Sequence, residues 1–201
     1  MTATITAHSC SPFATRYGDF ALHAYELSDG RRHAVLVSGS LEVPADGVRL
    51  RLQSACLTGV SFGASLCDCR QQLEFALAAL ALQPGILFYL DQEGRGHGWE
   101  RKVAELNLMR TKGYDTVEAA AALGLEVDLR EYDSSRLMLE DLFGSVPPVR
   151  LLTNNPERIA RLRSVGVDVI ERLPIEPAAT EENRPYLLVK RDKLGHLLSG
   201  L

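Results

Sequence analysis

The chain has 201 residues, of which 46% are hydrophobic, and a formal net charge of -4. This length accommodates one ordinary domain or two small ones, and the apolar content is enough to fill a core without disulfides. The acidic balance argues against a surface that coats a nucleic acid polymer. The sequence shows neither a signal-peptide pattern nor the roughly 18 to 20 apolar residues that span a bilayer. We therefore expect a cytoplasmic protein with no nucleic acid and no membrane as partner.

Apolar stretches and turn formers alternate along the chain. Between residues 15 and 52, short apolar stretches are broken by turn formers, which predicts a meander of β-strands. Residues 71–82 are strong helix formers, followed by a Pro-Gly stop signal and an apolar run that predicts a buried strand over 86–90. Beyond these, the pattern predicts helices over 101–112, 134–142 and 156–165 and strands over 149–152 and 167–170.

This alternation indicates an α+β fold with a mixed β-sheet core and packed helices. No internal repeat and no low-complexity linker divides the chain, so we expect a single domain over residues 1–201. Within it, residues 1–14 and 175–201 are expected to be flexible or extended. The stretch from residue 174 onward is rich in polar residues and turn formers before a short basic segment.

Three of the four cysteines, Cys56, Cys67 and Cys69, form a cluster in the sequence. Three soft ligands fit zinc, and neither a fourth cysteine nor a histidine lies between residues 53 and 70. A structural zinc site normally has four protein ligands, so this count favours an open catalytic site whose bound water becomes a nucleophile. Two alternatives stay open: buried small apolar side chains, or a closed structural site completed by His97 or His196. The fourth cysteine, Cys10, is interpreted as an incidental thiol.

Five short sequence motifs, two of which contain the clustered cysteines, follow one another along the chain. They are CLTG at 56–59, CDC at 67–69, QEGRG at 92–96, GYDTVEA at 113–119 and RLLTNNP at 150–156. Together they resemble the GTP cyclohydrolase II family, and the likeness runs from residue 18 to residue 196. The resemblance implies a homodimeric hydrolase that opens the imidazole ring of GTP and releases formate and pyrophosphate in riboflavin synthesis. At this length the chain would carry the cyclohydrolase unit alone.

The resemblance also implies roles for matching residues. Cys56, Cys67 and Cys69 would bind one zinc ion, Asp128 would accept a proton, and Arg130 is the group proposed to attack the α-phosphate. A carboxylate near a metal stays ionised and can orient a proton for transfer. A protonated arginine is a poor nucleophile, so stabilising the departing pyrophosphate is at least as natural a role for Arg130. Without the family, the two residues would be interpreted as an ordinary surface pair.

A nucleotide pocket follows from the resemblance in the same way. The positions that match contacts to GTP are Arg51, Gln72, Glu93, Gly94, Arg95, Thr116, Thr153 and Arg158. These residue types suit different parts of a nucleotide. Glu93 can accept hydrogen bonds from a purine edge, the three arginines can bind phosphates, and Gly94 allows the ligand to approach the backbone closely. The string TNNP alone is typical of a strand-to-helix turn with an Asn cap. The pyrophosphate leaving group normally needs Mg²⁺, which is inferred from the chemistry alone.

Several residues depart from the usual family pattern close to the expected site. Gln53 and Ala55 replace a histidine and a glutamate, and the other departures are Val60, Arg70, Asp91, His97, Trp99 and the lack of a tyrosine in residues 101–112. Because drift should fall mostly on the surface, these changes indicate a diverged substrate or product. GTP remains the first expectation. The alternatives are another nucleotide such as UTP, arrest at the ring-opened formamide, a non-catalytic nucleotide-binding homologue and a structural zinc module.

Overall fold

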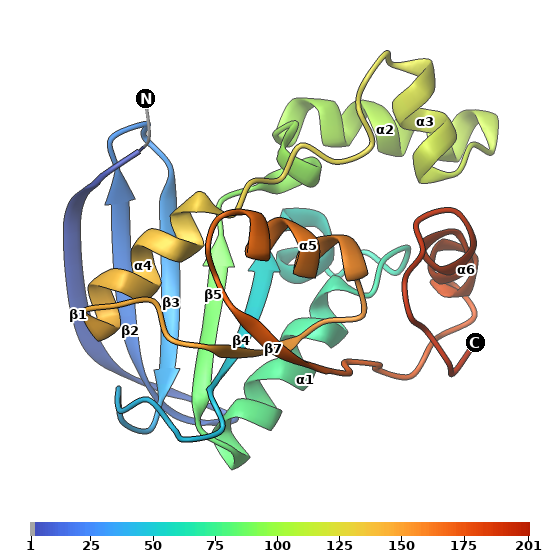
Figure 1. Cartoon of the computed structure of the whole chain (residues 1–201). Coiled ribbons are helices and arrows are strands. Elements are labelled where there is room, and N and C mark those ends of the chain that lie inside the picture. Colours follow the sequence, from blue (N-terminus) through green and yellow to red (C-terminus); the bar gives the residue numbers. More distant parts are fainter. Residues whose placement is uncertain (1–2) are drawn as a thin grey trace.

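The computed structural model describes residues 3–201 and contains one mixed sheet with helices on both sides (Figure 1). The strands are β1 (Ile5–Thr15), β2 (Gly18–Leu27), β3 (Arg32–Ser38), β4 (Val48–Ser54), β5 (Gly85–Leu90), β6 (Val149–Leu152) and β7 (Val169–Leu173). The α-helices are α1 (Cys69–Leu82), α2 (Trp99–Lys112), α3 (Thr116–Ala122), α4 (Asp133–Phe143), α5 (Pro156–Ser164) and α6 (Arg184–Asp192). Two short helical turns, η1 (Leu57–Ser61) and η2 (Glu93–Gly96), follow β4 and β5.

The strand order is β1-β2-β3-β5-β4-β6-β7. The first part of this order, from β1 to β5, is antiparallel, whereas β5, β4, β6 and β7 run parallel to one another. The carboxyl ends of the parallel strands therefore meet at one edge of the sheet, with β4 in the middle. In open sheets of this kind, ligands bind beyond the carboxyl ends of the strands.

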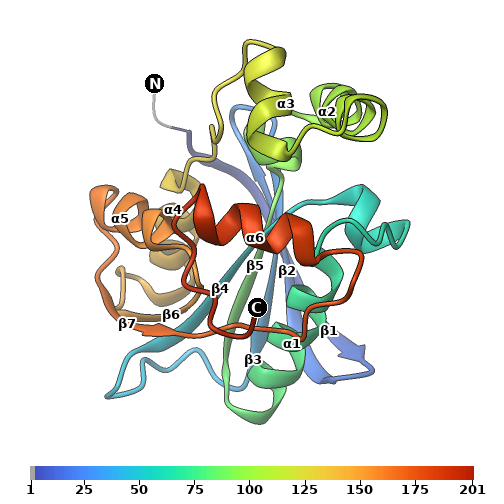
Figure 2. The same ribbon diagram turned by 90° about the vertical axis from the view of Figure 1, so that its right-hand side faces the viewer.

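Strand β5 shows how the sheet is buried on both faces. Its residues alternate: Phe88 packs in the core beneath α4 and α5, while Leu87 packs in the core beneath α1. Both side chains are fully buried. A strand covered on both faces must be apolar throughout, which explains the continuous run at residues 86–90. Figure 2 shows the sheet between α1 on one side and α4 with α5 on the other.

The α+β prediction is confirmed, and the predicted helices and strands lie within a few residues of the observed ones. Two helices were missed. Helix α3 begins with a capping box, in which the Asp115 side chain accepts the backbone N–H of Glu118 and the Glu118 carboxylate accepts the N–H of Asp115. That Asp-x-x-Glu pattern was the signal that could have found it.

The ends of the chain differ from a simple extended arm. Residues 5–15 form edge strand β1, paired along its length with β2, and residues 1–2 lie outside the described part. At the other end, the expected extended arm contains helix α6. The reason is that Pro185 occupies its first turn and Leu187 is buried against the body of the protein. In the described chain, no helix is long and apolar enough to cross a membrane.

Candidate active site

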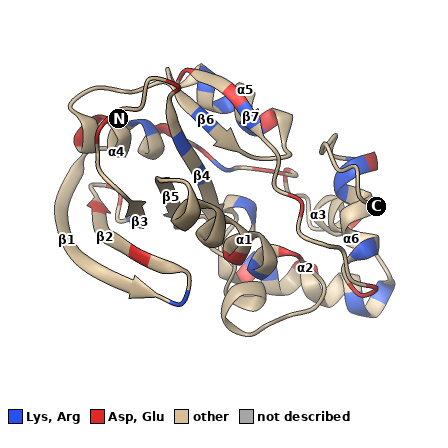
Figure 3. Ribbon diagram, turned by 90° about the horizontal axis from the view of Figure 1, so that it is seen from below, with Lys and Arg blue, Asp and Glu red and all other residues tan. Residues whose placement is uncertain are grey.

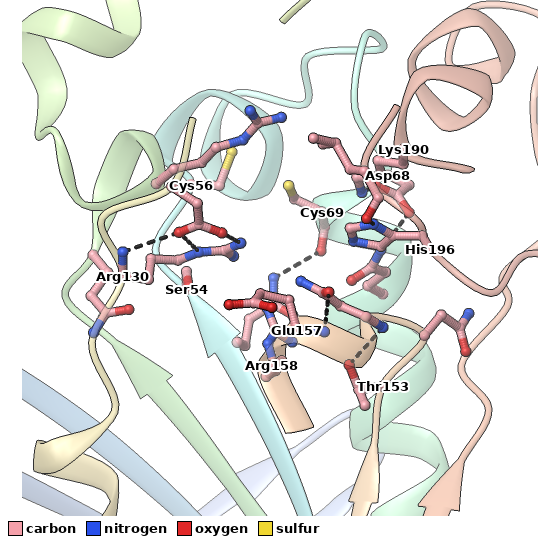
Figure 4. A pocket seen from close by; sticks show the side chains of 18 of the residues that line it. Ser54, Cys56, Asp68, Cys69, Arg130, Thr153, Glu157, Arg158, Lys190 and His196 are labelled. Atoms are coloured by element: carbon pink, nitrogen blue, oxygen red, sulfur yellow. Dashed lines mark hydrogen bonds and ion pairs between the residues drawn. The ribbon is translucent and has the colours of Figure 1, made fainter. Parts of the chain in front are cut away.

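A cavity of about 510 Å³ opens at the carboxyl edge of the parallel strands (Figure 4). Its wall includes the residues that directly follow three strands: 54–56 after β4, 92–95 after β5, and 153–155 after β6. Helices α1, α5 and α6 supply further lining side chains. The cavity thus occupies the position that the sheet topology favours for a ligand.

The three clustered cysteines meet in this region. The sulfur atoms of Cys56, Cys67 and Cys69 all lie within 4.8 Å of one another. Cys56 follows β4, whereas the other two stand at the start of α1, and turn η1 brings the chain back between them. In residues 3–201 no histidine joins this group, because only the three cysteines meet the distance limit.

Gly59, in turn η1, keeps the space between the sulfurs open. A Cβ atom at this position would lie 2.5 Å from the Cys67 sulfur and 3.2 Å from the Cys56 sulfur. At 2.5 Å a side chain at this position would displace the Cys67 sulfur. The cradle, together with three soft donors, fits a thiophilic cation such as zinc.

The protonation of the cluster also favours a cation. Hydrogen bonds from the Cys67 and Cys69 thiols lower the pKa of Cys56, and the same contacts, together with burial, raise the pKa of Cys69. A bound divalent cation would stabilise all three thiolates and release protons.

Glu93, at the start of η2, ties its loop to the metal-ligand segment. Its Oε2 accepts the backbone N–H of Leu57 at 2.6 Å, and its Oε1 accepts the N–H of Gly94 at 3.0 Å. Leu57 directly follows Cys56. The carboxylate therefore positions the first cysteine, and only its remaining lone pairs can face a ligand.

Arg95 is held in an unusual backbone conformation. Its φ of 58° is the one positive value among non-glycine residues in the described chain. Such a conformation costs on the order of 1–3 kcal/mol and tends to occur at functional sites. Its carbonyl accepts the N–H of Leu129 at 2.9 Å, and its guanidinium donates to Thr116 Oγ1 at 2.9 Å. The loop therefore braces the segment that carries Asp128 and Arg130.

Asp128 and Arg130 form a forked ion pair in the cavity wall. Arg130 Nε donates to Asp128 Oδ1 at 2.9 Å, and its Nη2 donates to Oδ2. Burial opposes both charges, but the contact with Arg130 lowers the pKa of Asp128, and the contact with Asp128 raises that of Arg130. At neutral pH the carboxylate is ionised and the guanidinium protonated.

Arg51, on β4, is buried beneath the cavity. It donates to the carbonyl of Leu152 at 3.1 Å, to Gln53 Oε1 at 2.8 Å and to Gln72 Oε1 at 2.6 Å. Burial, with help from the nearby Arg158 charge, lowers its pKa to about 9. The Gln53 amide reaches the carbonyl of Cys69 at 3.4 Å. Gln53 thus links the Arg51 guanidinium to the backbone carbonyl of Cys69.

Arg158, on α5, also joins separate elements. Its Nη1 donates to the carbonyl of Leu52 at 3.0 Å, and its Nε lies 3.3 Å from the Tyr132 hydroxyl. Thr153 Oγ1 accepts the N–H of Asn155, whose own side chain caps α5. The expected strand-to-helix turn with an Asn cap is confirmed.

Eleven of the thirteen residues named from the sequence line the cavity. The exceptions are Cys67, which reaches the site through the sulfur cluster, and Thr116, which lies behind Arg95. Sequence reasoning missed cavity residues on α6, including Tyr186 and Lys190, because it expected an extended arm there. Their i, i+4 spacing after Pro185 was an available helical signal.

Asp68 was also missed, although it stands between two of the cysteines. It is 4% exposed, accepts from Lys190 Nζ at 2.6 Å and also accepts from the Gln72 amide. Burial opposes the charge of Lys190, but Tyr186 and Asp68 outweigh it and raise the pKa of the ammonium. Figure 4 shows Lys190 and Asp68 together, with Arg130 on the other side of the cysteines.

The charge of the cavity differs from that of the whole chain. Seven arginine or lysine side chains line it against five carboxylates, whereas the chain carries a net charge of -4. Figure 3 shows basic segments on β4, α5 and α6. A concave wall with a cationic excess attracts polyanionic ligands.

Ala55 borders a second hollow as well. A cavity of about 530 Å³ is lined by Ala55 together with Tyr89, Asp91 and parts of β1, β2 and β3. Ala55 and Asp91 are two of the positions that depart from the family pattern. Ala55 lines both cavities, whereas Asp91 lines the second one.

Comparison with known proteins supports the family resemblance. A family model for GTP cyclohydrolase II matches residues 7–174. Proteins named GTP cyclohydrolase-2 from Neisseria meningitidis serogroup B and Neisseria gonorrhoeae are each 43% identical over 188 residues, covering 92% of this chain and 92% of each relative. The riboflavin biosynthesis protein RibBA of Bacillus subtilis is 44% identical over 186 residues, covering 92% of this chain and 46% of that longer protein. The chain belongs to the GTP cyclohydrolase II family of hydrolases.

Proposed function

We propose that the chain, as a single cyclohydrolase domain, is a zinc-dependent enzyme that opens the imidazole ring of GTP and releases formate and pyrophosphate for riboflavin biosynthesis. One observation carries the proposal: the three-thiol cluster with its Gly59 cradle stands at the same cavity as the Asp128–Arg130 fork. Family membership and the names of the relatives support the substrate and the pathway.

The cysteines account for the metal. Cys56, Cys67 and Cys69 would hold one zinc ion, leaving a coordination position open. When bound there, zinc would supply a Lewis acid that lowers the pKa of a water molecule. Mg²⁺ would accompany the triphosphate and neutralise part of its charge.

Asp128 and Arg130 would divide the remaining chemistry. Asp128 is ionised and held in a fixed orientation by Arg130, which suits it to accept a proton from the attacking water. Arg130 stays protonated in this fork. Its guanidinium therefore suits binding of the α-phosphate and stabilisation of the departing pyrophosphate better than nucleophilic attack.

The other cavity residues would bind the nucleotide. Arg51, Arg95 and Arg158 add positive charge for the phosphates, while the free lone pairs of Glu93 can accept from the base. Gly94 leaves room for the ligand beside the backbone, and Gln72 and Thr153 offer polar contacts. Thr116 would act through Arg95, since it holds that guanidinium.

A cytoplasmic homodimer is also proposed from the family resemblance, and light scattering would measure its mass.

A changed base is the second candidate function. Ala55 offers no side-chain acceptor where the two cavities meet, and both Glu93 oxygens already accept backbone N–H groups. The missing acceptor at Ala55 favours a base with fewer donors on its edge, such as uracil, whereas the lone pairs that remain on Glu93 favour guanine. Helix α2 also contains no tyrosine, which favours arrest at the formamide.

The decisive experiment measures formate and pyrophosphate release by zinc-loaded protein from GTP, ATP, UTP and CTP. The proposal expects both products from GTP. Turnover of UTP alone would support the second candidate, and pyrophosphate with a retained formyl group would show arrest at the formamide. No turnover of any of the four would contradict the enzyme and leave a non-catalytic nucleotide-binding protein or a structural zinc module.

A further inference from the structure

Helix α6 supplies side chains to the wall of the proposed catalytic cavity, and it lies beyond residue 174, where the match to the family model ends. The lining residues from this segment include Tyr186, Lys190, Leu194 and His196. Figure 2 shows α6 in front of the sheet, and Figure 1 shows it set off to the side of β4 and β5. The C-terminal segment therefore contributes side chains to the same site as the residues within the matched region.

Lys190 is the cation that this wall brings to the cavity. Its side chain is 13% exposed, its Nζ lies 2.6 Å from Asp68 Oδ1, and the ammonium stands 4.6 Å from the centre of the Tyr186 ring. An ammonium has three N–H donors. Within residues 3–201, Asp68 is the one hydrogen-bond acceptor that Lys190 Nζ contacts, so two donors remain for a ligand.

Asp68 connects Lys190 to the other cations of the site. Its second oxygen accepts from the Gln72 amide, and the Gln72 carbonyl oxygen in turn accepts from Arg51 at 2.6 Å. One carboxylate thus fixes an ammonium from α6 and, through Gln72, a guanidinium from β4. Cations gathered in one cavity attract a ligand with several adjacent negative charges.

We propose that α6 supplies a phosphate-binding subsite, in which the Lys190 ammonium donates to the phosphate chain of the nucleotide while Asp68 holds it in place. This inference rests on the proposed function insofar as the natural ligand is a nucleoside triphosphate. Lys190 is then a substrate-binding residue, and Asp68 is a positioning residue.

The competing explanation is that the ion pair only anchors α6. A buried ion pair often breaks even against a neutral pair of the same shape, whereas removing one partner leaves an unpaired charge that is costly. If the ion pair only anchors α6, removing both charges together should leave ligand binding intact. If Lys190 binds phosphate, the same double change should weaken binding, because the cation itself is lost.

The experiment titrates tripolyphosphate into zinc-loaded full-length protein by calorimetry. We expect Lys190→Met to weaken binding about ten-fold or more, and Lys190→Arg, which keeps the charge, to stay within a few-fold of the parent. Lys193→Met is the matched control. Lys193 lies three residues away, is 45% exposed and pairs with Asp115 and Glu118 outside the cavity, so binding should change less than about two-fold.

The double variant Asp68→Asn with Lys190→Met separates the two explanations. We expect it to bind tripolyphosphate as weakly as Lys190→Met, because the ammonium is absent from both. Asp68→Asn alone keeps the ammonium but loses the carboxylate that orients it, so it should bind more weakly than the parent and more tightly than Lys190→Met. Recovery of binding in the double variant, equal loss in Lys193→Met, or no binding by the parent would overturn the inference. Formate and pyrophosphate release test the proposed function separately, so a protein that turns over no nucleotide can still show Lys190-dependent binding.

Discussion

The cavity has two walls that are built in opposite ways. The metal wall comprises the three cysteines and Gly59, all within residues 56–69. The cationic wall comprises Arg51, Arg130, Arg158 and Lys190, which come from four separate segments. Donor atoms that must lie within a few ångströms of one ion come from one short stretch of sequence. Cations that must surround a long polyanion come from distant segments that the fold brings together.

The two walls also differ in what satisfies their polar groups. In the metal wall the three thiols contact one another, and these contacts lower the pKa of Cys56 and raise the pKa of Cys69. In the cationic wall, Arg51 and Arg158 already donate to carbonyls of Leu152 and Leu52, joining β4 to β6 and α5 to β4. Loss of a metal-wall residue should therefore affect the ion first, whereas loss of a cationic residue should affect ligand and packing together.

The largest effect is expected from Cys67→Ser on the metal wall. A serine hydroxyl is a poor zinc ligand, so zinc content should fall and ring opening should drop by about a thousand-fold or more. Metal analysis combined with a formate assay would measure both. Cys10→Ser is the control, since Cys10 is exposed and distant from the cavity lining. Normal zinc and normal turnover in Cys67→Ser would refute the ligand assignment.

Arg130→Ala tests the cationic wall. Removing a guanidinium that stabilises developing charge should slow pyrophosphate release by about a hundred-fold to a thousand-fold, with zinc content unchanged. Arg130→Lys should recover part of the rate if the residue acts as a cation. Unchanged pyrophosphate release in Arg130→Ala would show that the two walls do not divide the chemistry in this way.

Gly59→Ala tests whether the cradle sets the shape of the metal wall. The new methyl group would collide with the Cys67 sulfur, so zinc affinity should fall by about ten-fold to a hundred-fold. Gly200→Ala is a matched control, because its nearest neighbour beyond the adjacent residues lies 3.8 Å away. Competition with a chromogenic chelator would measure the zinc affinity of each variant. Equal zinc affinities of Gly59→Ala and Gly200→Ala would show that Gly59 does not shape the metal site.

The smallest effect concerns acid stability of the cationic wall. Because the folded-state pKa of Asp128 lies below the ordinary aspartate value of 3.8, the pair with Arg130 stabilises the protein fully above that value. Its contribution is lost as the pH falls through the lower folded-state pKa. Asp128→Asn should therefore be less stable than the parent by about 1–2 kcal/mol at pH 7, and the gap should close as the pH falls through the lowered folded-state pKa of Asp128. A gap that closes between pH 7 and 5 would contradict this account.

Local patterns in the sequence were enough for the sheet core and the metal wall. The apolar run at 86–90 predicted a buried strand, and the Asn-Pro pair at 155–156 predicted the cap of α5. The spacing of the cysteines predicted a metal cluster, and the structure brings the three sulfurs together. These features depend on neighbours a few residues away, which is the range that sequence spacing records.

Other features needed the tertiary structure. Glu93 ties down the segment after Cys56, Thr116 stands behind Arg95, and Lys190 meets Asp68 across 122 residues of sequence. A nine-residue helix such as α6 is marginal by itself, so it depends on packing against the cavity edge. The sequence alone therefore determined which thiols lie together, because the three cysteines are close along the chain. Only the folded chain decided which cations surround the ligand, because each is placed by contacts between distant elements.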